Sequence, residues 1–229
     1  MIITETVSVV IPAYNEETII EKTLDTLVFD WIKEIIIIND GSRDNTLRYI
    51  CEFKSKTTFP VKIINQKKNI GKGKAVELGL KQAGGEIIAL IDADLGKSVK
   101  EVERLVLPVL KGTAEVTIGV LPIKSGGIGL VRKLADKGLN FITGKKLKAP
   151  LSGQRVFKKK ILNDSLPLSD NFGLEIGMDI DILRNGYKVM EISCDMTHKI
   201  TGNDWKGYCH RGHQFISILR TLWQKKVRI

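Results

Sequence analysis

The sequence predicts an α/β protein whose central sheet is mostly parallel and is covered by helices on both faces. Over about the first 120 residues, short apolar runs alternate with segments whose apolar residues recur at helical spacing. The runs are rich in β-branched residues and are apolar at nearly every position, which is typical of strands buried on both faces. Strands that alternate with helices in this way are characteristic of parallel sheets.

In this first part, each expected strand is one of the apolar runs and each expected helix is one of the periodic segments. In the first helix, for example, apolar residues recur on one face at Ile19, Ile20, Leu24 and Leu27. In chain order we expect strand 7–11, helix 16–27, strand 35–38, helix 44–53, strand 61–64, helix 73–83, strand 87–91, helix 99–110 and strand 116–118.

The second part of the chain has shorter and less regular elements. It follows Pro122 with a Gly-rich stretch at residues 125–129, and no internal repeat or low-complexity segment is present. We expect a basic helix at 130–142, a strand at 155–157, a helix at 173–185, a strand at 188–192 and an amphipathic helix at 205–223.

Composition and charge restrict the class of protein. The 229 residues, 43% of them hydrophobic and 27% charged, suit one globular domain, or one domain with a small appendage. No apolar run approaches the length of a membrane span, and the first residues lack the features of a signal peptide, so we expect a cytoplasmic protein. The net charge of +10 favours an anionic partner, which includes phosphorylated small molecules, membrane surfaces and nucleic acids.

Polar segments follow four of the predicted strands, at the sheet edge where open parallel α/β proteins bind their ligands. Asp92-Ala93-Asp94 is the most informative of them, because two carboxylates can hold a divalent cation against a diphosphate. Helix caps and turns are the alternative explanation for these segments. The segments are residues 12–16, 39–42, 69–74 and 92–94.

Two common nucleotide-binding motifs are absent from the sequence. A dinucleotide-binding Rossmann domain needs Gly-x-Gly-x-x-Gly after its first strand, and residues 12–15 contain no glycine. A P-loop needs Ser or Thr after its Gly-Lys pair, whereas Gly73-Lys74 is followed by Ala75. We therefore expect neither a dinucleotide-binding domain nor a P-loop ATPase.

The strand-end segments carry a specific resemblance. They read Val-Ser-Val-Val-Ile-Pro-Ala-Tyr-Asn-Glu-Glu at 7–17, Asn-Asp-Gly-Ser-Arg-Asp-Asn-Thr at 39–46, Asn-Ile-Gly-Lys-Gly-Lys-Ala at 69–75 and Asp-Ala-Asp-Leu at 92–95. In this order and spacing they resemble the family 2 glycosyltransferases of GT-A fold. The resemblance implies a GT-A (Rossmann-like), mostly parallel sheet in one continuous domain. Residues 1–121 would bind a nucleotide sugar, UDP-glucose or a related UDP-sugar, and residues 122–229 the acceptor.

The same resemblance assigns donor-binding residues. It implies that Lys72 meets the diphosphate, that Asp92 meets the ribose or a metal ion, and that Asp94 binds the metal. The residues implied to bind the nucleotide sugar are Pro12, Ala13, Tyr14, Asn15, Glu16, Asp40, Lys72, Asp92 and Ala93.

A narrower resemblance concerns the metal. Residues 71–75, 172–177 and the pair His198-Lys199 resemble glucosyl-3-phosphoglycerate synthases, in which the matching histidine completes the metal shell. This implies a site for Mn²⁺ or Mg²⁺ made of Asp92, Asp94 and His198, since an imidazole beside carboxylates suits Mn²⁺ and tolerates Mg²⁺. The other histidines, His210 and His213, are the alternatives for the third position.

The acceptor is expected to carry a phosphate. Residues 151–157, Leu-Ser-Gly-Gln-Arg-Val-Phe, resemble the Ser-Gly-Phe-Arg segment of polyprenyl-phosphate (dolichyl-phosphate-type) sugar transferases, and also lie at the acceptor-loop position of the phosphoglycerate enzymes. A guanidinium recognises phosphate oxygens in pairs. A phosphoglycerate-like molecule and a polyprenyl phosphate both stay open. The expected acceptor-binding residues are Ser152, Gly153, Gln154, Arg155, Lys199 and Arg211.

Two carboxylates are expected to act in catalysis, Asp94 through the cation and Glu175 directly. In an inverting enzyme Glu175 would deprotonate the acceptor, and in a retaining enzyme it would orient acceptor or sugar hydroxyls. A carboxylate favoured at a helix start is the alternative for Glu175. For Asp179 and Asp181 we expect surface or supporting positions.

The C-terminal part suggests a lid and a surface helix. Residues 197–212 are rich in glycine and cations, which predicts a mobile lid over the sugar diphosphate, with a static basic loop as the alternative. The apolar face of the following helix indicates core packing or attachment to the inner face of a membrane. The apolar face consists of Tyr208, Phe215, Ile218, Leu219 and Leu222, and the residues suited to a membrane interface are Trp223, Lys225, Lys226 and Arg228.

Two other functions compete with glycosyl transfer. A nucleotidyltransferase shares a nucleotide-binding sheet and paired carboxylates, but usually has a Gly-rich loop where this chain has residues 12–15. A non-catalytic module could use the basic surface to bind nucleic acid or membrane. The set of strand-end residues favours the transferase without a nucleic-acid partner, and the oligomeric state stays open.

Overall fold

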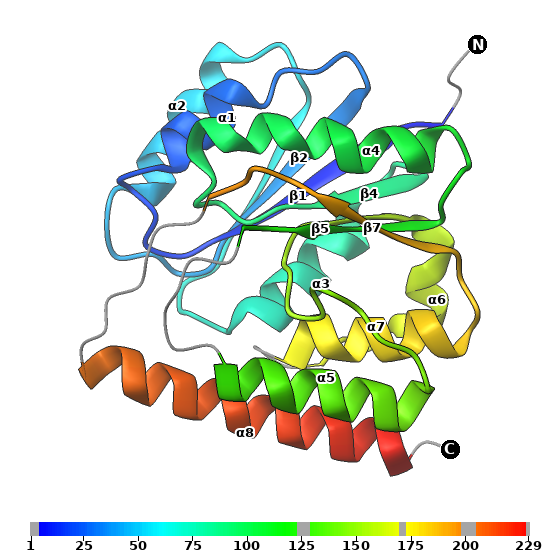
Figure 1. Cartoon of the computed structure of the whole chain (residues 1–229). Coiled ribbons are helices and arrows are strands. Elements are labelled where there is room, and N and C mark those ends of the chain that lie inside the picture. The colour runs from blue at the N-terminus through cyan, green and yellow to red at the C-terminus, as the bar shows by residue number, and fades with distance from the viewer. Residues whose placement is uncertain (1–4, 123–128, 170–172, 198–204, 228–229) are drawn as a thin grey trace.

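The structure is a computed structural model that describes residues 5–122, 129–169, 173–197 and 205–227. Over these residues the chain folds around a single seven-stranded sheet in the order β3-β2-β1-β4-β6-β5-β7 (Figure 1). The strands are β1 (Val7–Ala13), β2 (Ile32–Asn39), β3 (Val61–Asn65), β4 (Ile87–Leu90), β5 (Val116–Val120), β6 (Arg155–Lys158) and β7 (Val189–Ser193).

One strand departs from the parallel arrangement. β6 pairs antiparallel with β4 on one side and with β5 on the other, whereas the other described pairs are parallel. The start of β6 therefore lies beside the end of β4, with Leu90 opposite Arg155. Strands from both halves of the sequence share this sheet, so the division at residue 121 does not separate two sheets.

Helices cover both faces of the sheet, as the sequence predicts. The helices are α1 (Ile20–Thr26), α2 (Thr46–Lys56), α3 (Lys72–Gln82), α4 (Val102–Leu110), α5 (Gly129–Thr143), α6 (Leu162–Ser165), α7 (Leu174–Arg184) and α8 (Trp205–Val227). Apolar residues of α1, α2 and α4 pack on one face, and those of α3, α6 and α7 pack on the other.

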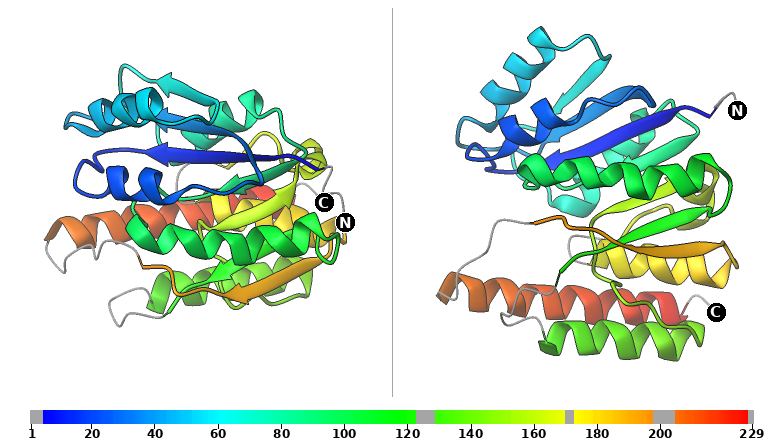
Figure 2. Two further views of the ribbon diagram at one scale, coloured as in Figure 1. Left: turned by 90° about the horizontal axis from the view of Figure 1, so that it is seen from above. Right: turned by 45° about the horizontal axis from the view of Figure 1, so that its top comes forward.

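A further layer lies beyond α7. Helices α5 and α8 lie side by side against α7 in every view (Figures 1 and 2), and their apolar residues form a third cluster with Ile176, Ile180 and Leu183 of α7. Every residue from Leu174 to Leu183 is consequently buried. Burial on all sides explains why α7 lacks the one-sided pattern of a surface helix.

The predicted elements are confirmed, with differences at their ends. The first helix begins at Ile20 rather than at residue 16, because the preceding loop is hydrogen-bonded to the loop after β2. The helix expected from residue 99 begins with a 3₁₀ segment, Gly96–Glu101, and becomes α4 at Val102. A short 3₁₀ turn, Lys159–Ile161, and α6 were not predicted. None of the described helices combines the length and the apolar character that a bilayer span requires.

Candidate functional site

The loops after β1 and β2 are joined side by side at the carboxyl edge of the sheet. The backbone N–H of Asn15 donates to Ser42 Oγ at 3.0 Å, and the N–H of Arg43 donates to Asn15 Oδ1 at 2.9 Å. Asn15 has a φ of 57°, a left-handed conformation that asparagine tolerates better than most residues. These bonds hold the half-exposed ring of Tyr14 at the edge.

Asp40 shapes the next loop from within. Its carboxylate is buried and accepts the N–H groups of Ile70 at 2.8 Å and Gly71 at 3.0 Å. Gly41 has a φ of +70° and lies so close to this loop that a Cβ would come within 2.4 Å of the carbonyl carbon of Lys68. The loop that precedes α3 is therefore fixed by the end of β2, and with it the position of Lys72.

Lys72 links two carboxylates from distant parts of the chain. As the first residue of α3, it places its Nζ 2.9 Å from Asp92 Oδ1 and 2.8 Å from Glu175 Oε1. Burial alone would lower the pKa of the Lys72 ammonium, but the charges of Asp92 and Glu175 outweigh it and raise the pKa above its usual range. Lys72 is therefore a permanent cation between residues that lie after β4 and at the start of α7.

Asp92 is held from its other side by Gln154. The Gln154 Nε2 donates to Asp92 Oδ2 at 2.8 Å, and the Asp92 backbone N–H donates to Gln154 Oε1 at 3.2 Å. Gly153 packs so closely that a Cβ there would lie 2.3 Å from Asp92 Oδ2. We call this arrangement of Gly153 and Gln154 around Asp92 the Asp92 clasp. It exists because β6 starts where β4 ends.

The structure corrects the assignment of Arg155 to the acceptor. Its side chain is fully buried, Nη1 pairs with Asp179 Oδ1 at 2.5 Å, and Nε donates to the Ser152 carbonyl at 2.9 Å. Burial raises the pKa of the Asp179 carboxyl to about 6, against the opposing charge of Arg155. A guanidinium with these partners and no exposed surface does not contact a phosphate. It holds the start of β6 and α7 together beneath the site.

Other sequence-based assignments also change with burial. The side chains of Ala13 and Ala93 are buried in the core cluster that includes residues of α1, so neither side chain is exposed to a ligand. The Ala93 carbonyl accepts from Thr23 Oγ1 at 2.8 Å. Asp179 and Asp181 are supporting residues, as one of the two expectations had it, but they are buried and not at the surface.

The predicted metal ligands are only partly described. Asp92 and Asp94 follow β4 at the edge of the sheet, whereas His198 and Lys199 lie outside the described residues. Arg211 and His210 belong to α8, but their side chains are also outside the described part. Within the part of the chain that the structure covers, no three His, Cys, Asp or Glu side chains form a metal-binding group. Two carboxylates one residue apart after the same strand nevertheless suit the chemistry of a Mg²⁺ or Mn²⁺ ion that takes further oxygens from a diphosphate.

The predicted lid is partly helical. Residues 198–204 lie outside the described residues, while α8 begins at Trp205, so the last part of the expected lid is helix. Closure of this segment over the sugar diphosphate stays a prediction.

The sequence did not reveal that Gln154 pairs with Asp92 and Asp179 with Arg155. The only available signal was Arg155, a cation at the start of an otherwise apolar run, which in a buried strand requires a carboxylate partner. Which carboxylate this is depends on the packing of α7 against β6.

The arrangement provides the parts needed for handling a diphosphate. Two carboxylates can hold a cation, Lys72 carries a positive charge beside them, and the N–H groups at the start of α3 favour an anion. Glu175, at the start of α7, adds a nearly buried carboxylate on the opposite side of Lys72.

Comparisons with known proteins agree on the family and the fold. The model of the family described as Glycosyl transferase family 2 matches residues 8–166. Dolichol-phosphate mannosyltransferase of Pyrococcus furiosus is 30% identical over 198 residues, which are 81% of this chain and 55% of that protein. The chain thus spans about half the length of this relative.

Two further matches cover a larger share of the matched protein. UDP-N-acetylglucosamine–dolichyl-phosphate N-acetylglucosaminyltransferase of Methanococcus voltae is 30% identical over 181 residues, 69% of this chain and 72% of that protein. The crystal structure of glucosyl-3-phosphoglycerate synthase from Mycobacterium tuberculosis with Mn²⁺, UDP-glucose and phosphoglyceric acid matches with a TM-score of 0.78 and 26% identity. That match covers 97% of this chain and 80% of the other.

The shared architecture confirms the predicted GT-A (Rossmann-like) fold. The family model also covers more than half of the chain, including the loops that carry Tyr14, Asp40, Lys72 and Asp92. The chain therefore belongs to glycosyl transferase family 2.

Proposed function

We propose that this protein is a metal-dependent glycosyltransferase that moves a hexose from a UDP-sugar, UDP-glucose or a related one, to a phosphorylated acceptor. The observation that carries the proposal is the position of Lys72 between Asp92 and Glu175 at the carboxyl edge of the sheet. This places a fixed cation between the carboxylates expected on the donor side and on the acceptor side.

The donor would lie across the ends of β1, β2 and β4. Tyr14 and the loop held by Asn15 and Ser42 form the outer wall for the nucleoside, and Asp40 sets the loop from which Lys72 reaches the diphosphate. Pro12 and Glu16 belong to the same proposed donor site. Because Asp40 uses its carboxylate oxygens on backbone N–H groups, its contribution to the nucleoside is mainly to position this loop.

A divalent cation would be held by Asp92 and Asp94, with His198 as the proposed third ligand. When bound, Mn²⁺ or Mg²⁺ supplies positive charge where the departing nucleoside diphosphate becomes more negative. Lys72 adds to that charge from the start of α3. Gly153 and Gln154 fix the carboxylate of Asp92, so this group is in place before the donor arrives.

The acceptor would enter from the side of Glu175. This carboxylate can accept a hydrogen bond from an acceptor or sugar hydroxyl, and a phosphate acceptor requires little deprotonation because it is already an anion. Arg155 and Gln154 are not part of the proposed acceptor contacts. Ser152, Lys199 and Arg211 remain proposed acceptor residues, the last two outside the part of the chain with described side chains.

Similar proteins support a phosphorylated acceptor of one of two kinds. The Pyrococcus and Methanococcus relatives are named for dolichol or dolichyl phosphate, and the Mycobacterium structure contains phosphoglyceric acid. The proposal therefore includes two acceptors, a polyprenyl phosphate and a small phosphorylated carboxylic acid. If the acceptor is a polyprenyl phosphate, the proposal includes a cytoplasmic protein that contacts the inner face of a membrane.

The donor site is tested by thermal unfolding with UDP-, GDP- and ADP-sugars, each with and without Mn²⁺. A ligand present at one hundred times its Kd stabilises the native state by about 2.7 kcal/mol, which raises the Tm of a protein of this size by roughly 5–10 °C. We expect this shift with a UDP-sugar plus Mn²⁺, a much smaller one without the metal, and its loss in Asp94→Ala.

The matched control is Asp25→Ala, which removes an exposed carboxylate of α1 away from the site. It should keep the full shift. An equal shift in Asp94→Ala and Asp25→Ala, or no metal-dependent shift with any donor, would contradict the proposal.

A further inference from the structure

The outer layer of α5 and α8 exposes large apolar side chains on its solvent side. Phe141 of α5 is 73% exposed, and Ile216 and Trp223 of α8 are 64% and 67% exposed. Leu219, one turn from each of these two α8 residues, is 43% exposed. Half of the large apolar side chains that are exposed in the described part of the chain therefore lie on these two helices, which makes a cluster and not a scatter of single residues.

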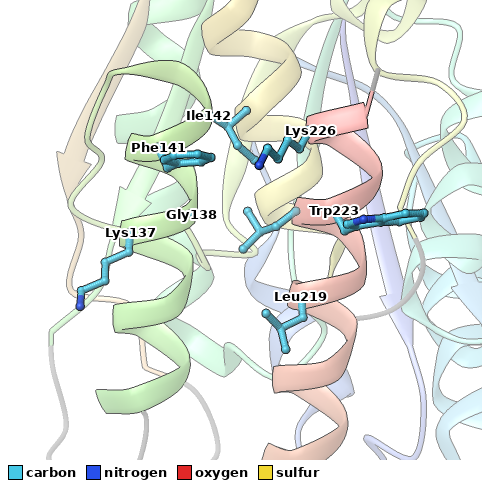
Figure 3. A pocket seen from close by; sticks show the side chains of 8 residues that line it. Lys137, Gly138, Phe141, Ile142, Leu219, Trp223 and Lys226 are labelled. Atoms are coloured by element: carbon cyan, nitrogen blue, oxygen red, sulfur yellow. The ribbon is translucent and has the colours of Figure 1, made fainter. Parts of the chain in front are cut away.

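Three of these side chains, Phe141, Leu219 and Trp223, line a shallow groove between the two helices (Figure 3). The groove has a volume of about 480 Å³, and Lys137, Gly138, Phe141, Leu219, Trp223 and Lys226 are among its lining residues. Phe141 and Lys226 point toward one another across it, with Lys226 Nζ 5.1 Å from the centre of the ring, whereas Trp223 points away from α5. The exposed aromatic rings thus extend over a wider surface than the groove itself.

The same face is positively charged. Lys133 and Lys137 of α5 and Arg220 and Lys226 of α8 are exposed, and Lys137 and Lys226 line the groove itself. The sequence of the two helices contains one acidic residue, Asp136, which is partly buried and 3.9 Å from Arg132. We call the surface formed by Lys133, Lys137, Phe141, Ile216, Leu219, Arg220, Trp223 and Lys226 the basic aromatic face.

The tertiary structure changes which residues can contact a membrane. Lys225, assigned to the interface from the sequence, is buried and pairs with Asp181 of α7. Its carbonyl accepts from Arg184 at 2.8 Å, so this side of α8 is attached to the protein. The outward side is made of α8 and α5 together, and α5 contributes Phe141, the most exposed of its apolar side chains that the structure describes.

We infer that the basic aromatic face binds the surface of an anionic lipid bilayer, with α5 and α8 lying parallel to it. Lysine and arginine attract acidic headgroups, and tryptophan and phenylalanine insert at the boundary between headgroups and acyl chains. A second copy of this chain is the less suitable occupant, because two such faces would oppose lysines to lysines without acidic partners. This inference rests on the membrane contact included in the proposed function and names the surface that makes it. Vesicle binding needs neither donor nor acceptor, so it is measured separately from glycosyl transfer.

The inference is tested by co-sedimentation of the full chain with vesicles of phosphatidylcholine, with and without phosphatidylglycerol. We expect binding to the anionic vesicles and little to the neutral ones. A Phe141→Ser/Trp223→Ser variant should bind at least about tenfold more weakly, because it loses two inserted rings. A Lys137→Ser/Lys226→Ser variant should lose binding by a similar factor, since each lysine near an anionic surface contributes about fivefold.

The matched control is Val28→Ser, which replaces a valine that is 63% exposed and far from α5 and α8 in the sequence. It should bind like the unchanged protein, and thermal unfolding of every variant checks that the fold is kept. Equal binding of all variants, or no binding of the unchanged protein to anionic vesicles, would overturn the inference. The inference would also be overturned if light scattering showed a dimer that the Phe141→Ser/Trp223→Ser variant no longer forms, while its vesicle binding is unchanged. None of these outcomes bears on the donor shift expected above.

Discussion

At the scale of single residues, the site depends on contacts between side chains that are far apart in the sequence, which the short motifs do not reveal. Lys72 was expected to meet a diphosphate, and its position between Asp92 and Glu175 is compatible with that role. Gln154 was expected at the acceptor, yet its amide is bonded to Asp92. Sequence similarity indicated that residue 154 belongs to the site. The hydrogen bonds show that its partner is Asp92.

Gln154→Met tests the Asp92 clasp at this scale. Methionine has a similar volume but cannot donate to Asp92 Oδ2 or accept from the Asp92 N–H, so the carboxylate loses its fixed orientation. We expect the affinity for UDP plus Mn²⁺, measured by titration calorimetry, to fall by about tenfold, as is common when an outer partner of a metal ligand is removed.

The acceptor KM should stay unchanged in Gln154→Met, because Gln154 does not contact the acceptor in this proposal. Gln82→Met, at the exposed end of α3, is the control and should bind UDP plus Mn²⁺ normally. A raised acceptor KM with unchanged UDP affinity would show that Gln154 contacts the acceptor and would contradict the Asp92 clasp.

At the scale of elements, α7 connects the site to the rest of the molecule. It carries Glu175 to Lys72, Asp179 to Arg155 and Asp181 to Lys225. Three carboxylates on one buried helix thus contact the start of α3, the start of β6 and the end of α8. The position of Glu175 is therefore determined by α7 as a whole.

Asp179→Asn tests this support. The change leaves the guanidinium of Arg155 buried without a charged partner, which typically costs about 3–5 kcal/mol in the free energy of unfolding. The double change Arg155→Met/Asp179→Leu removes both charges and should recover most of this loss. Urea unfolding measures the free energy of unfolding of the single and the double variant.

The control for Asp179→Asn is Glu52→Gln, which breaks the exposed Arg48–Glu52 pair on α2. Exposed pairs contribute little, so the free energy of unfolding should change by less than about 1 kcal/mol. If Asp179→Asn were as mild as this control, α7 would not be held by the buried pair.

Most elements could be predicted from the sequence because their apolar residues repeat with the period of a strand or a helix. The run 35–38 and the helix 73–83 are found in the structure as β2 and α3 with small changes at their ends. The antiparallel direction of β6 could not be predicted, because Arg155–Phe157 has the same local pattern in either direction. Direction depends on the long connection through α5, which the sequence does not orient.

At the scale of the whole molecule, charge and shape act together. The chain has a net charge of +10, and the basic aromatic face concentrates cations on one side of it. Figure 2 shows that α5 and α8 form an outer layer, separated from the sheet by α7. A membrane bound there would lie against one side of the domain while the loops after the strands remain at another.

Ionic strength should separate lipid-borne from soluble acceptors. Raising salt from 0.1 M to 1 M shortens the Debye length from about 10 Å to about 3 Å, which weakens attraction between the basic aromatic face and acidic headgroups. We expect the rate with a polyprenyl phosphate in anionic vesicles to fall severalfold more than the rate with a soluble phosphorylated acceptor. Both rates are measured by UDP release. Equal salt dependence would show that this face does not assist transfer to lipid.

The sequence by itself determined the family, the α/β fold and the strand-end segments of the donor site, because these depend on local periodicity and on short motifs that fall at one edge of a parallel sheet. Only the tertiary structure decided the partners of Asp92, Arg155 and Lys225. Their partners, Gln154, Asp179 and Asp181, are 62, 24 and 44 residues away in the chain. Such contacts arise from the antiparallel insertion of β6 and from the burial of α7 between two layers, which no local pattern encodes.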